Sequence, residues 1–503
     1  MVTGDPIQKS GCRSIREDCR APAPFRVHSP FSGNGEGTAM SPGRSPARAG
    51  SCSTASTEGV GILTGDPENA IVSLSVPMIL AMLLMASYNV INAIWVAGLG
   101  SDALAAVGFM TPVFMVLMGI GTGIGAGAAS AIARRIGAGD RTGAGNGAVH
   151  ALLISLGLSA VVTLPLVTWA GWLAILFGAE GTANLAAEYG RILFAGSFFI
   201  LFVNIAYGVL RAEGDARRTM QVMVAVCLLN ILLDPLLIYG LGLGIAGAAW
   251  GTIVSLAAAS VIIAYWFFVR KDTYVCLSRQ VFAPSRSLAA DILYVGIPAS
   301  AEFLLMSAMC IILNLMLVRI ATTDAVAVFS IGFRILSYGI VPVVAIGTSV
   351  VSVVGAAYGA GQYQKIRVAH SFSIRLGVAM AFVVSTVILL YAGQIASVFS
   401  YSADSARLSP DIVAFIGVMA FMFPFVPLGL MSSSVFQGVG KGPTSLFLTF
   451  MRSLVFAAVF AYLLAFTLNT GERGVWWGMV AGEMAGGLLA YAWARRYLAG
   501  MEG

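Results

Sequence analysis

The stretch Asn230-Ile-Leu-Leu-Asp234-Pro235-Leu-Leu-Ile-Tyr239 places one carboxylate inside a long apolar run. A charged side chain at the centre of a bilayer costs about 3 kcal/mol on insertion scales, so a chain that keeps one usually turns it towards the bundle interior and uses it. Asn230 lies one helical turn before Asp234 and therefore on the same face. Pro235 removes a backbone donor and creates a local break. The alternative is a buried aspartate that only pins a neighbouring helix.

The composition is typical of a polytopic membrane protein. Of 503 residues, 58% are apolar and only 10% are charged, which differs from soluble globular chains. Apolar runs of about 20 residues recur, and each can span a hydrocarbon core as a helix. The net charge is +6, and the basic residues lie in the short connections between the apolar runs, where positive-inside topology places them. We therefore expect contact with the lipid bilayer and no nucleic-acid partner.

Twelve candidate spans follow one another along the chain. They cover approximately residues 71–97, 104–133, 147–170, 190–211, 220–240, 245–269, 290–317, 325–355, 369–393, 411–435, 444–467 and 475–494. One set of alternate loops is rich in Arg and Lys, whereas the opposite set holds little beyond Arg319, Arg407 and Arg473. This bias predicts a multi-pass protein of the inner (plasma) membrane with both termini in the cytoplasm.

The chain repeats itself at a nearly constant offset. Ser101-Asp-Ala-Leu-Ala recurs as Thr323-Asp-Ala-Val-Ala, 222 residues later. Further pairs in the same order are Gly125 with Gly347, Gly137 with Gly359, Gly214 with Gly440, Gly247 with Gly474, and Trp250 with Trp477, while Pro77 and Pro298 open the first span of each half. Six spans return the chain to its starting side, so the halves share one orientation.

The repeat predicts the fold class and the domains. We expect an all-α fold of twelve transmembrane helices in two six-helix lobes, related by a pseudo-two-fold axis along the membrane normal. The N-lobe would cover residues 61–275 and the C-lobe residues 276–503. Residues 1–60 are rich in Pro, Ser, Gly and Arg without a signal-peptide run, which predicts a disordered extension. The internal Met40 leaves the true start open.

No constellation in the chain indicates catalysis or a resident cofactor. The six cysteines and three histidines are scattered, without the spacing of a zinc or redox site. The run Gly121-x-Gly123-x-Gly125-x-Gly127 lacks the strand setting and the Lys-Ser/Thr ending of a phosphate loop, so we expect it to permit close helix approach. We predict a protein that is not an enzyme and needs no cofactor.

Six short motifs occur together in one known transporter family. They are Asp66-Pro67, Val96-Ala-Gly-Leu-Gly100, Leu104-Ala-Ala-Val-Gly108, Leu210-Arg-Ala-Glu-Gly-Asp215, Asn230-x-x-x-Asp234-Pro235 and Gly247-x-x-Trp250-Gly-Thr252. Together they resemble the multidrug and toxic compound extrusion (MATE) family, in colinear order from residue 62 to about 497. The resemblance implies a monomer whose two lobes rock between inward- and outward-open states. Import of Na⁺ or H⁺ would drive export of small organic, cationic or amphipathic compounds.

The resemblance also implies a site for the coupling cation in the N-lobe. Carried over residue by residue, Asn230, Asp234 and Thr252 would bind the Na⁺ or H⁺. Two positions depart from the family pattern, because Asn92 stands where relatives carry aspartate and Tyr207 where they carry asparagine. An amide oxygen can coordinate Na⁺ but cannot take a proton at neutral pH. Coupling would then run through Asp234 alone or would have changed, which leaves the ion and its stoichiometry open.

The second half of the chain differs at the corresponding place. The counterpart of Asp234, near Phe460 and Ala461, is apolar, so the first half alone supplies this carboxylate. Glu302, four residues after Pro298, is the second carboxylate inside a span. Glu302 could line the C-lobe side of the cleft or reach to water near the helix end, and the sequence favours neither.

Two other functions fit parts of the pattern. A lipid-linked saccharide flippase shares the architecture of the superfamily, but it should have a more cationic cleft than these spans, which are nearly free of Lys and Arg. A membrane sensor or scaffold that never transports is the other alternative. Substrate flux in proteoliposomes would separate it from a transporter.

Overall fold

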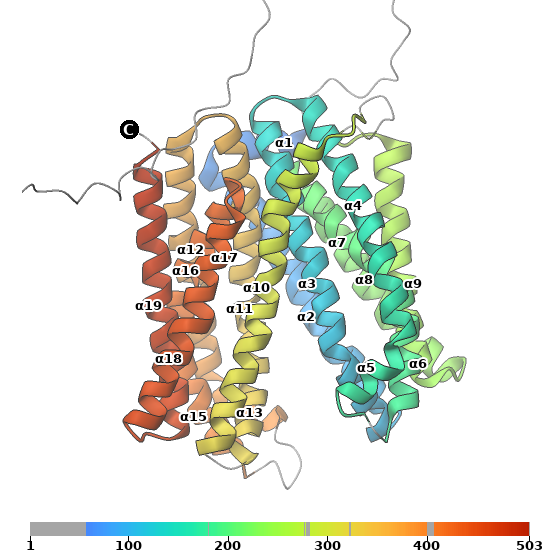
Figure 1. The fold of residues 1–503 in the computed structure, drawn as a ribbon, viewed down its shortest axis with the longest axis vertical. Helices are drawn as coiled ribbons and strands as arrows, with labels where there is room; N and C mark the ends of the chain where they lie inside the picture. The colour runs from blue at the N-terminus through green and yellow to red at the C-terminus, as the bar shows by residue number, and fades with distance from the viewer. Residues whose placement is uncertain are drawn as a thin grey trace, which may run out of the picture. The chain divides into compact units, whose positions relative to one another are not determined.

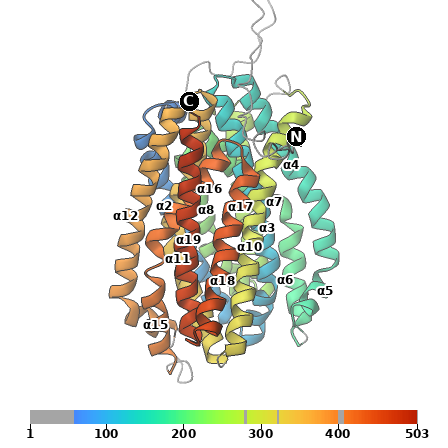
Figure 2. The same ribbon diagram turned by 60° about the vertical axis from the view of Figure 1, so that its left-hand side comes forward.

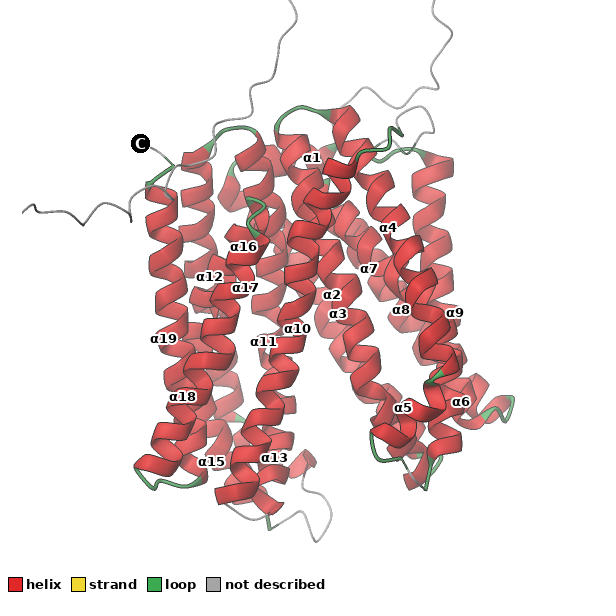
Figure 3. Cartoon of the chain, viewed as in Figure 1, coloured by secondary structure: helices red, strands yellow, loops and turns green. Residues whose placement is uncertain are grey.

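The structure is a computed structural model, and it describes residues 57–179, 181–275, 277, 282–320, 323–399 and 407–501. These residues belong to one compact unit, and their regular structure is entirely helical, as predicted (Figure 3). The expected disordered extension lies outside the described residues, apart from its last few positions. There the short helix α1 (Glu58–Thr64) begins, capped by the side chain of Thr57.

The long helices correspond to the predicted spans, and shorter helical segments accompany them (Figure 1). In the first half they are α2 (Pro67–Ala97), α3 (Ser101–Gly137), α4 (Arg141–Thr168), α5 (Ala170–Leu176), α6 (Ala183–Ala195), α7 (Ser197–Ala212), α8 (Ala216–Pro235) with η1 (Leu236–Gly240), and α9 (Gly244–Ala264) with η2 (Tyr265–Arg270). In the second half they are α10 (Arg286–Ile320), α11 (Thr323–Gly359), α12 (Tyr363–Leu390), α13 (Ala392–Phe399), α15 (Ser409–Met419), η3 (Phe423–Phe425), α16 (Val426–Gly438), α17 (Gly442–Phe450), η4 (Met451–Phe456), α18 (Ala457–Tyr462), η5 (Leu463–Thr467) and α19 (Glu472–Ala499).

The number of spans agrees with the prediction when the bent pair α6–α7 and the less apolar helix α19 are each counted as one span. Ten helical segments of the described chain are long and apolar enough to cross a membrane. The pair α6–α7, bent by 49°, makes an eleventh, and the Gly196-Ser197 pair at its break is a common cause of such kinks. The helix α19 has 28 residues but carries Glu483 and several glycines, which lower its apolar character. With α19, all twelve predicted spans are helices.

The glycine run of α3 lets two other helices approach closely, one on each side. A Cβ added at Gly119 would lie 2.9 Å from Cβ of Phe303, and one at Gly127 would lie 2.9 Å from Cα of Gly296, both on α10. Gly123 also faces α10, at Ser300, whereas Gly121 and Gly125 face α7, and a Cβ at Gly125 would lie 2.7 Å from the carbonyl oxygen of Asn204. Alternate glycines thus serve different neighbours, which confirms the predicted close approach of helices.

The two halves meet where the ends of α3 and α11 cross (Figures 1 and 2). A Cβ at Gly137 would lie 2.8 Å from Cα of Ala356, and a Cβ at Gly359 would lie 2.9 Å from Cα of Arg134. Each residue of the first contact is 222 positions from its equivalent in the second. Exchange of the halves therefore maps one contact onto the other, as a pseudo-two-fold axis requires.

Polar contacts hold the same end of the bundle together. Arg134 and Arg135 of α3 form ion pairs with Asp291 of α10 at 2.7 and 3.1 Å. The hydroxyl of Ser130 donates a hydrogen bond to the carbonyl oxygen of Gly438, at the end of α16, at 3.2 Å. The three contacts join the first half of the chain to the second, next to the crossing of α3 and α11.

Candidate functional site

Asp234 and Asn230 lie on one buried face of α8. Asp234 is fully buried and Asn230 is only 2% exposed. The facing residue on α9 is Gly251, where an added Cβ would overlap Oδ1 of Asp234 and lie 3.7 Å from Oδ1 of Asn230. The two predicted residues therefore converge on one point, and the absence of a side chain at Gly251 leaves room there.

Three side-chain oxygens at this point lack a hydrogen-bond partner among the described residues. They are Oδ1 of Asn230 and both carboxylate oxygens of Asp234. A buried acceptor without a donor costs about 1–3 kcal/mol, and such groups are rare in folded proteins. Oxygen atoms of this kind are the ligands that hard cations prefer, and a carboxylate can also accept a proton. The residues thus fit a small cation or a proton held between α8 and α9.

Thr252 follows Gly251 on α9 and connects this point to α2. Its hydroxyl donates to the carbonyl oxygen of Ala248 at 3.2 Å and also interacts with the hydroxyl of Tyr88 on α2. Tyr88 is 7% exposed, and Asp234 acts on its hydroxyl electrostatically, as it does on that of Tyr189 on α6. Sequence reasoning missed both tyrosines.

Asn92 reaches the site through Tyr88. Its Nδ2 donates a hydrogen bond to the Tyr88 hydroxyl at 3.1 Å, one helical turn away, while its Oδ1 is buried without a partner. The position that departs from the family pattern is thus linked to Thr252 by one tyrosine. The i, i+4 spacing of Tyr88 and Asn92 was the signal that could have revealed this link.

Tyr207 lies elsewhere in the N-lobe. This residue of α7 is 9% exposed, and its hydroxyl interacts with Cys227 and Arg211. The amide of α7 is Asn204, three residues earlier, which accepts a hydrogen bond from Thr122 of α3 at 3.4 Å. Sequence reasoning overlooked Asn204, although an asparagine inside an apolar span was a visible signal.

Glu302 faces the interior of the second half. Its carboxylate accepts hydrogen bonds from Ser445 at 2.8 Å and from Gln437 at 3.2 Å, so it is held between α10, α16 and α17. Nearby, Arg452 and Glu483 form an ion pair with side chains only 12% and 11% exposed, and Arg452 also acts on Glu302. These contacts place the carboxylate inside the lobe, among α10, α16 and α17, which differs from both the cleft wall and the reach to water considered from the sequence. Sequence reasoning did not single out the Arg452–Glu483 pair.

The equivalent point in the second half has no carboxylate. Gly478, the repeat partner of Gly251, approaches Ala461 so closely that an added Cβ would overlap its backbone. Ala461 therefore occupies the place that Asp234 has in the first half, which agrees with the predicted asymmetry. In the part of the chain that the structure describes, no group of three or more His, Cys, Asp or Glu could hold a metal ion. A site with one carboxylate and neutral oxygens suits a singly charged cation.

Comparisons with known proteins agree with this architecture. The family model described as MatE matches residues 77–236 and again residues 298–463, so each match begins at a proline predicted to open a half. The multidrug export protein MepA of Staphylococcus aureus (strain MSSA476) is 27% identical over 417 residues, which cover 82% of this chain and 90% of the relative.

Solved structures give the same result at higher identity. The crystal structure of MATE in complex with MaL6 has a TM-score of 0.86 and 42% identity, covering 89% of this chain and 99% of that one. The outward-facing conformation of a multidrug resistance MATE family transporter of the MOP superfamily has the same TM-score, identity and coverage of both chains.

Proposed function

Because this chain belongs to the MatE family of multidrug transporters, we propose that it exports organic cations and amphipathic compounds in exchange for Na⁺ or H⁺. It is a multi-pass protein of the cell membrane, and its family is non-enzymatic and requires no cofactor. Its relatives are named for multidrug export and multidrug resistance, which favours an exporter over a saccharide flippase or a sensor.

The observation that carries the proposal is the set of unpaired oxygens opposite Gly251. Asp234 and Asn230 present three buried acceptors to one point. Their desolvation is unfavourable unless a cation or a proton binds there. A cation bound at this point would neutralise Asp234 and bring α8 and α9 together.

Binding at this point can be transmitted to α2. The hydroxyl of Thr252 interacts with that of Tyr88, and Tyr88 accepts the hydrogen bond of Asn92, so two side chains of α2 would respond to the occupancy of the site. The helix α2 packs against α8 on one side and α11 on the other. A ligand shifts a conformational equilibrium only by its difference in affinity between the two states. We assign that difference to the desolvation of Asp234 in the two states.

The lobes and their orientation complete the proposal. The N-lobe, residues 61–275, would carry the cation site, and the C-lobe, residues 276–503, would move against it. The crossing of α3 and α11 lies at the end where Arg134, Arg135 and other basic loop residues gather, which positive-inside topology assigns to the cytoplasm together with both termini. The conformation described here would then be closed to the cytoplasm, as an outward-open state requires.

Export from proteoliposomes under imposed gradients tests this function. Vesicles loaded with the fluorescent cation ethidium would receive a Na⁺ gradient or a pH gradient, each alone. We expect one gradient to accelerate ethidium transport by the natural chain and neither to do so for Asp234→Asn. The control is Asp411→Asn, an exposed carboxylate at the start of α15, which should behave as the natural chain. Gradient-driven transport by Asp234→Asn at the natural rate would refute the site.

A further inference from the structure

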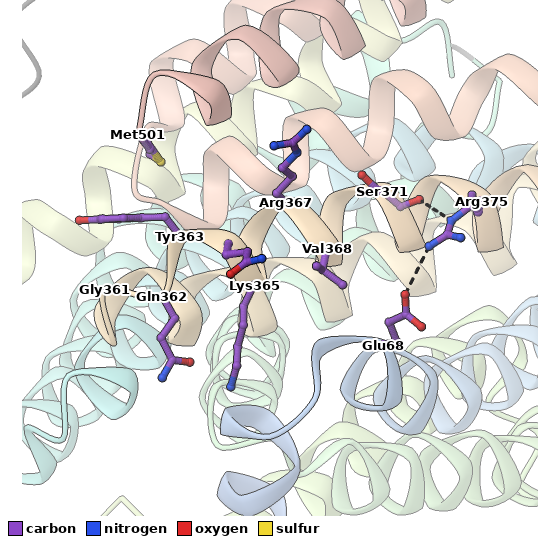
Figure 4. Close-up of a pocket in the computed structure, with 11 residues that line it drawn as sticks. Glu68, Gly361, Gln362, Tyr363, Lys365, Arg367, Val368, Ser371, Arg375 and Met501 are labelled. Carbon is purple, nitrogen blue, oxygen red and sulfur yellow. Dashed lines mark hydrogen bonds and ion pairs between the residues drawn. The ribbon is translucent and has the colours of Figure 1, made fainter. Parts of the chain in front are cut away.

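A surface hollow of about 1000 Å³ lies between the start of α2 and the first half of α12. Figure 4 shows Lys365 and Arg367 leaving α12 on opposite sides, with Arg375 pointing towards Glu68 of α2. The remaining lining comes from the loop before α12, from one face of that helix, and from Met501 near the end of the chain. We call this feature the α12 hollow. It is distinct from the cation site in α8 and α9.

The α12 hollow is cationic. Among the described residues that line it, three are basic, Lys365, Arg367 and Arg375, and one is acidic, Glu68. Lys365 donates to the carbonyl oxygens of Thr64 and Gly65 at 3.0 and 2.9 Å, which leaves its charge unbalanced by an acid there. Arg375 and Glu68 are 3.3 Å apart with side chains 70% and 42% exposed. Such exposed pairs are weak, so this arginine can change partner.

One face of α12 changes from polar to apolar along its length. Gln364, Val368, Ser371 and Arg375 share a face by their i, i+4, i+7 and i+11 spacing, and all four line the α12 hollow. The same face continues as the apolar residues Ala379, Phe382 and Val383, then Leu390. Phe382 is 65% exposed and Leu390 is 72% exposed. A cationic pocket directly above an exposed apolar strip matches the two parts of a phospholipid.

We propose that the α12 hollow binds the phosphate headgroup of an anionic phospholipid, whose acyl chains lie along the apolar face of α12. Arginine pairs well with phosphate oxygens, and basic residues at the cytoplasmic surface of a membrane attract anionic lipids. A free phosphate ion would gain the cationic contacts but nothing from Phe382 and Val383, which is why we assign the site to a lipid. The bound headgroup would touch α2 of the first half and α12 of the second, and so would join the two halves in this conformation.

Native mass spectrometry of the full chain with defined lipids tests the proposal. The probes are dioleoyl phosphatidylglycerol, dioleoyl phosphatidylcholine and inorganic phosphate. We expect the phosphatidylglycerol to bind more tightly than the phosphatidylcholine. Arg367→Gln and Arg375→Gln should each weaken phosphatidylglycerol binding about five-fold, which corresponds to about 1 kcal/mol for each lost charge. Each variant carries a single substitution, so failure of one to fold leaves the other as the test.

A matched control exists at the same end of the bundle. Arg217 is 74% exposed and lies 3.7 Å from Glu58, an exposed ion pair like that of Arg375 but outside the α12 hollow. Arg217→Gln should leave phosphatidylglycerol binding unchanged, and Phe382→Ser should weaken lipid binding through the apolar face. The proposal is overturned if the Arg367 and Arg375 variants retain the lipid as the natural chain does. It is also overturned if phosphatidylcholine binds equally well, or if inorganic phosphate binds as tightly as phosphatidylglycerol, which would indicate an ion site.

Discussion

Replacing Gly137 or Gly359 by alanine should separate the ends of α3 and α11. The new Cβ would lie 2.8 Å from Cα of Ala356 or 2.9 Å from Cα of Arg134, whereas carbon atoms in favourable contact are about 3.5–4.0 Å apart. The carbonyl oxygens of Ala356 and Arg134 lie closer still to the added Cβ, so the helices must separate by more than about 1 Å, because these backbone atoms cannot rotate away. Overpacking of this kind costs about 1–3 kcal/mol.

The cost applies only to the conformation in which the two ends touch. A difference of about 1–3 kcal/mol shifts a two-state equilibrium about 5- to 150-fold, so both variants should favour the state in which this end is open. Electron–electron distance measurements between spin labels at Arg217 and Gln364, both exposed, would detect a longer distance population. The background must first lose its six cysteines.

Gly157→Ala is the control for the effect of an extra methyl group. Gly157 lies within α4, and no atom lies within 4 Å of the Cβ that alanine would add. Its distance distribution should match that of the natural chain. The reasoning is refuted if Gly137→Ala and Gly359→Ala give that same distribution, because the crossing of α3 and α11 would then not determine which end is open.

Three further predictions concern single side chains. Gly251→Ala should crowd Oδ1 of Asp234 and raise the cation concentration needed for half-maximal transport about 10- to 100-fold, the usual effect of changing a residue that positions an ion ligand. Asn92→Asp adds a carboxylate whose repulsion a bound cation would relieve, so transport rates should depend more steeply on pH or Na⁺. Burial raises the pKa of Glu213, which lies outside the spans, to about 8. The melting temperature of the natural chain should therefore decrease as the pH rises from about 4.5 to 8, and that of Glu213→Gln should decrease less.

Each of these predictions has an outcome that contradicts it. An unchanged half-saturation for Gly251→Ala would show that the cation binds away from this glycine. Superimposable pH and Na⁺ curves for Asn92→Asp would leave Asp234 as the single acting carboxylate. Glu213 is 2% exposed, and the folded protein favours its protonated carboxyl. Stability is therefore lost as the pH rises from the ordinary pKa to the raised one. Parallel melting curves for Glu213→Gln would exclude it as the titrating group.

The spans were predictable because a membrane helix must satisfy its own backbone, so each appears as one long apolar run. Where the run was interrupted, the prediction was less complete. The predicted span 190–211 begins inside α6 (Ala183–Ala195), because the bend at Gly196 allows a more polar half to continue the helix. The short helices α5 and α13 were not predicted, since seven and eight residues are too few to give a periodic signal.

At the proposed cation site, the residues on one helix were predictable and the contacts between helices were not. Asn230 and Asp234 share a face of α8 by spacing alone. The part played by Gly251 depends on how α9 packs against α8, and that of Tyr88 depends on α2. The interpretation of Tyr207 as the position of the family's asparagine rested on motif spacing. It stays a prediction, and Asn204 of the same helix, which accepts a hydrogen bond from Thr122 of α3, is a second asparagine to consider there.

Coupled movement of the cation is the most direct test of the account. In proteoliposomes with equal Na⁺ and pH on both sides and a clamped membrane potential, an ethidium gradient alone should drive Na⁺ or H⁺ in the opposite direction. We predict this counterflow for the natural chain and none for Asp234→Asn, because the variant lacks the carboxylate to which we assign cation binding. The account is contradicted if Asp234→Asn moves as many cations for each ethidium as the natural chain does.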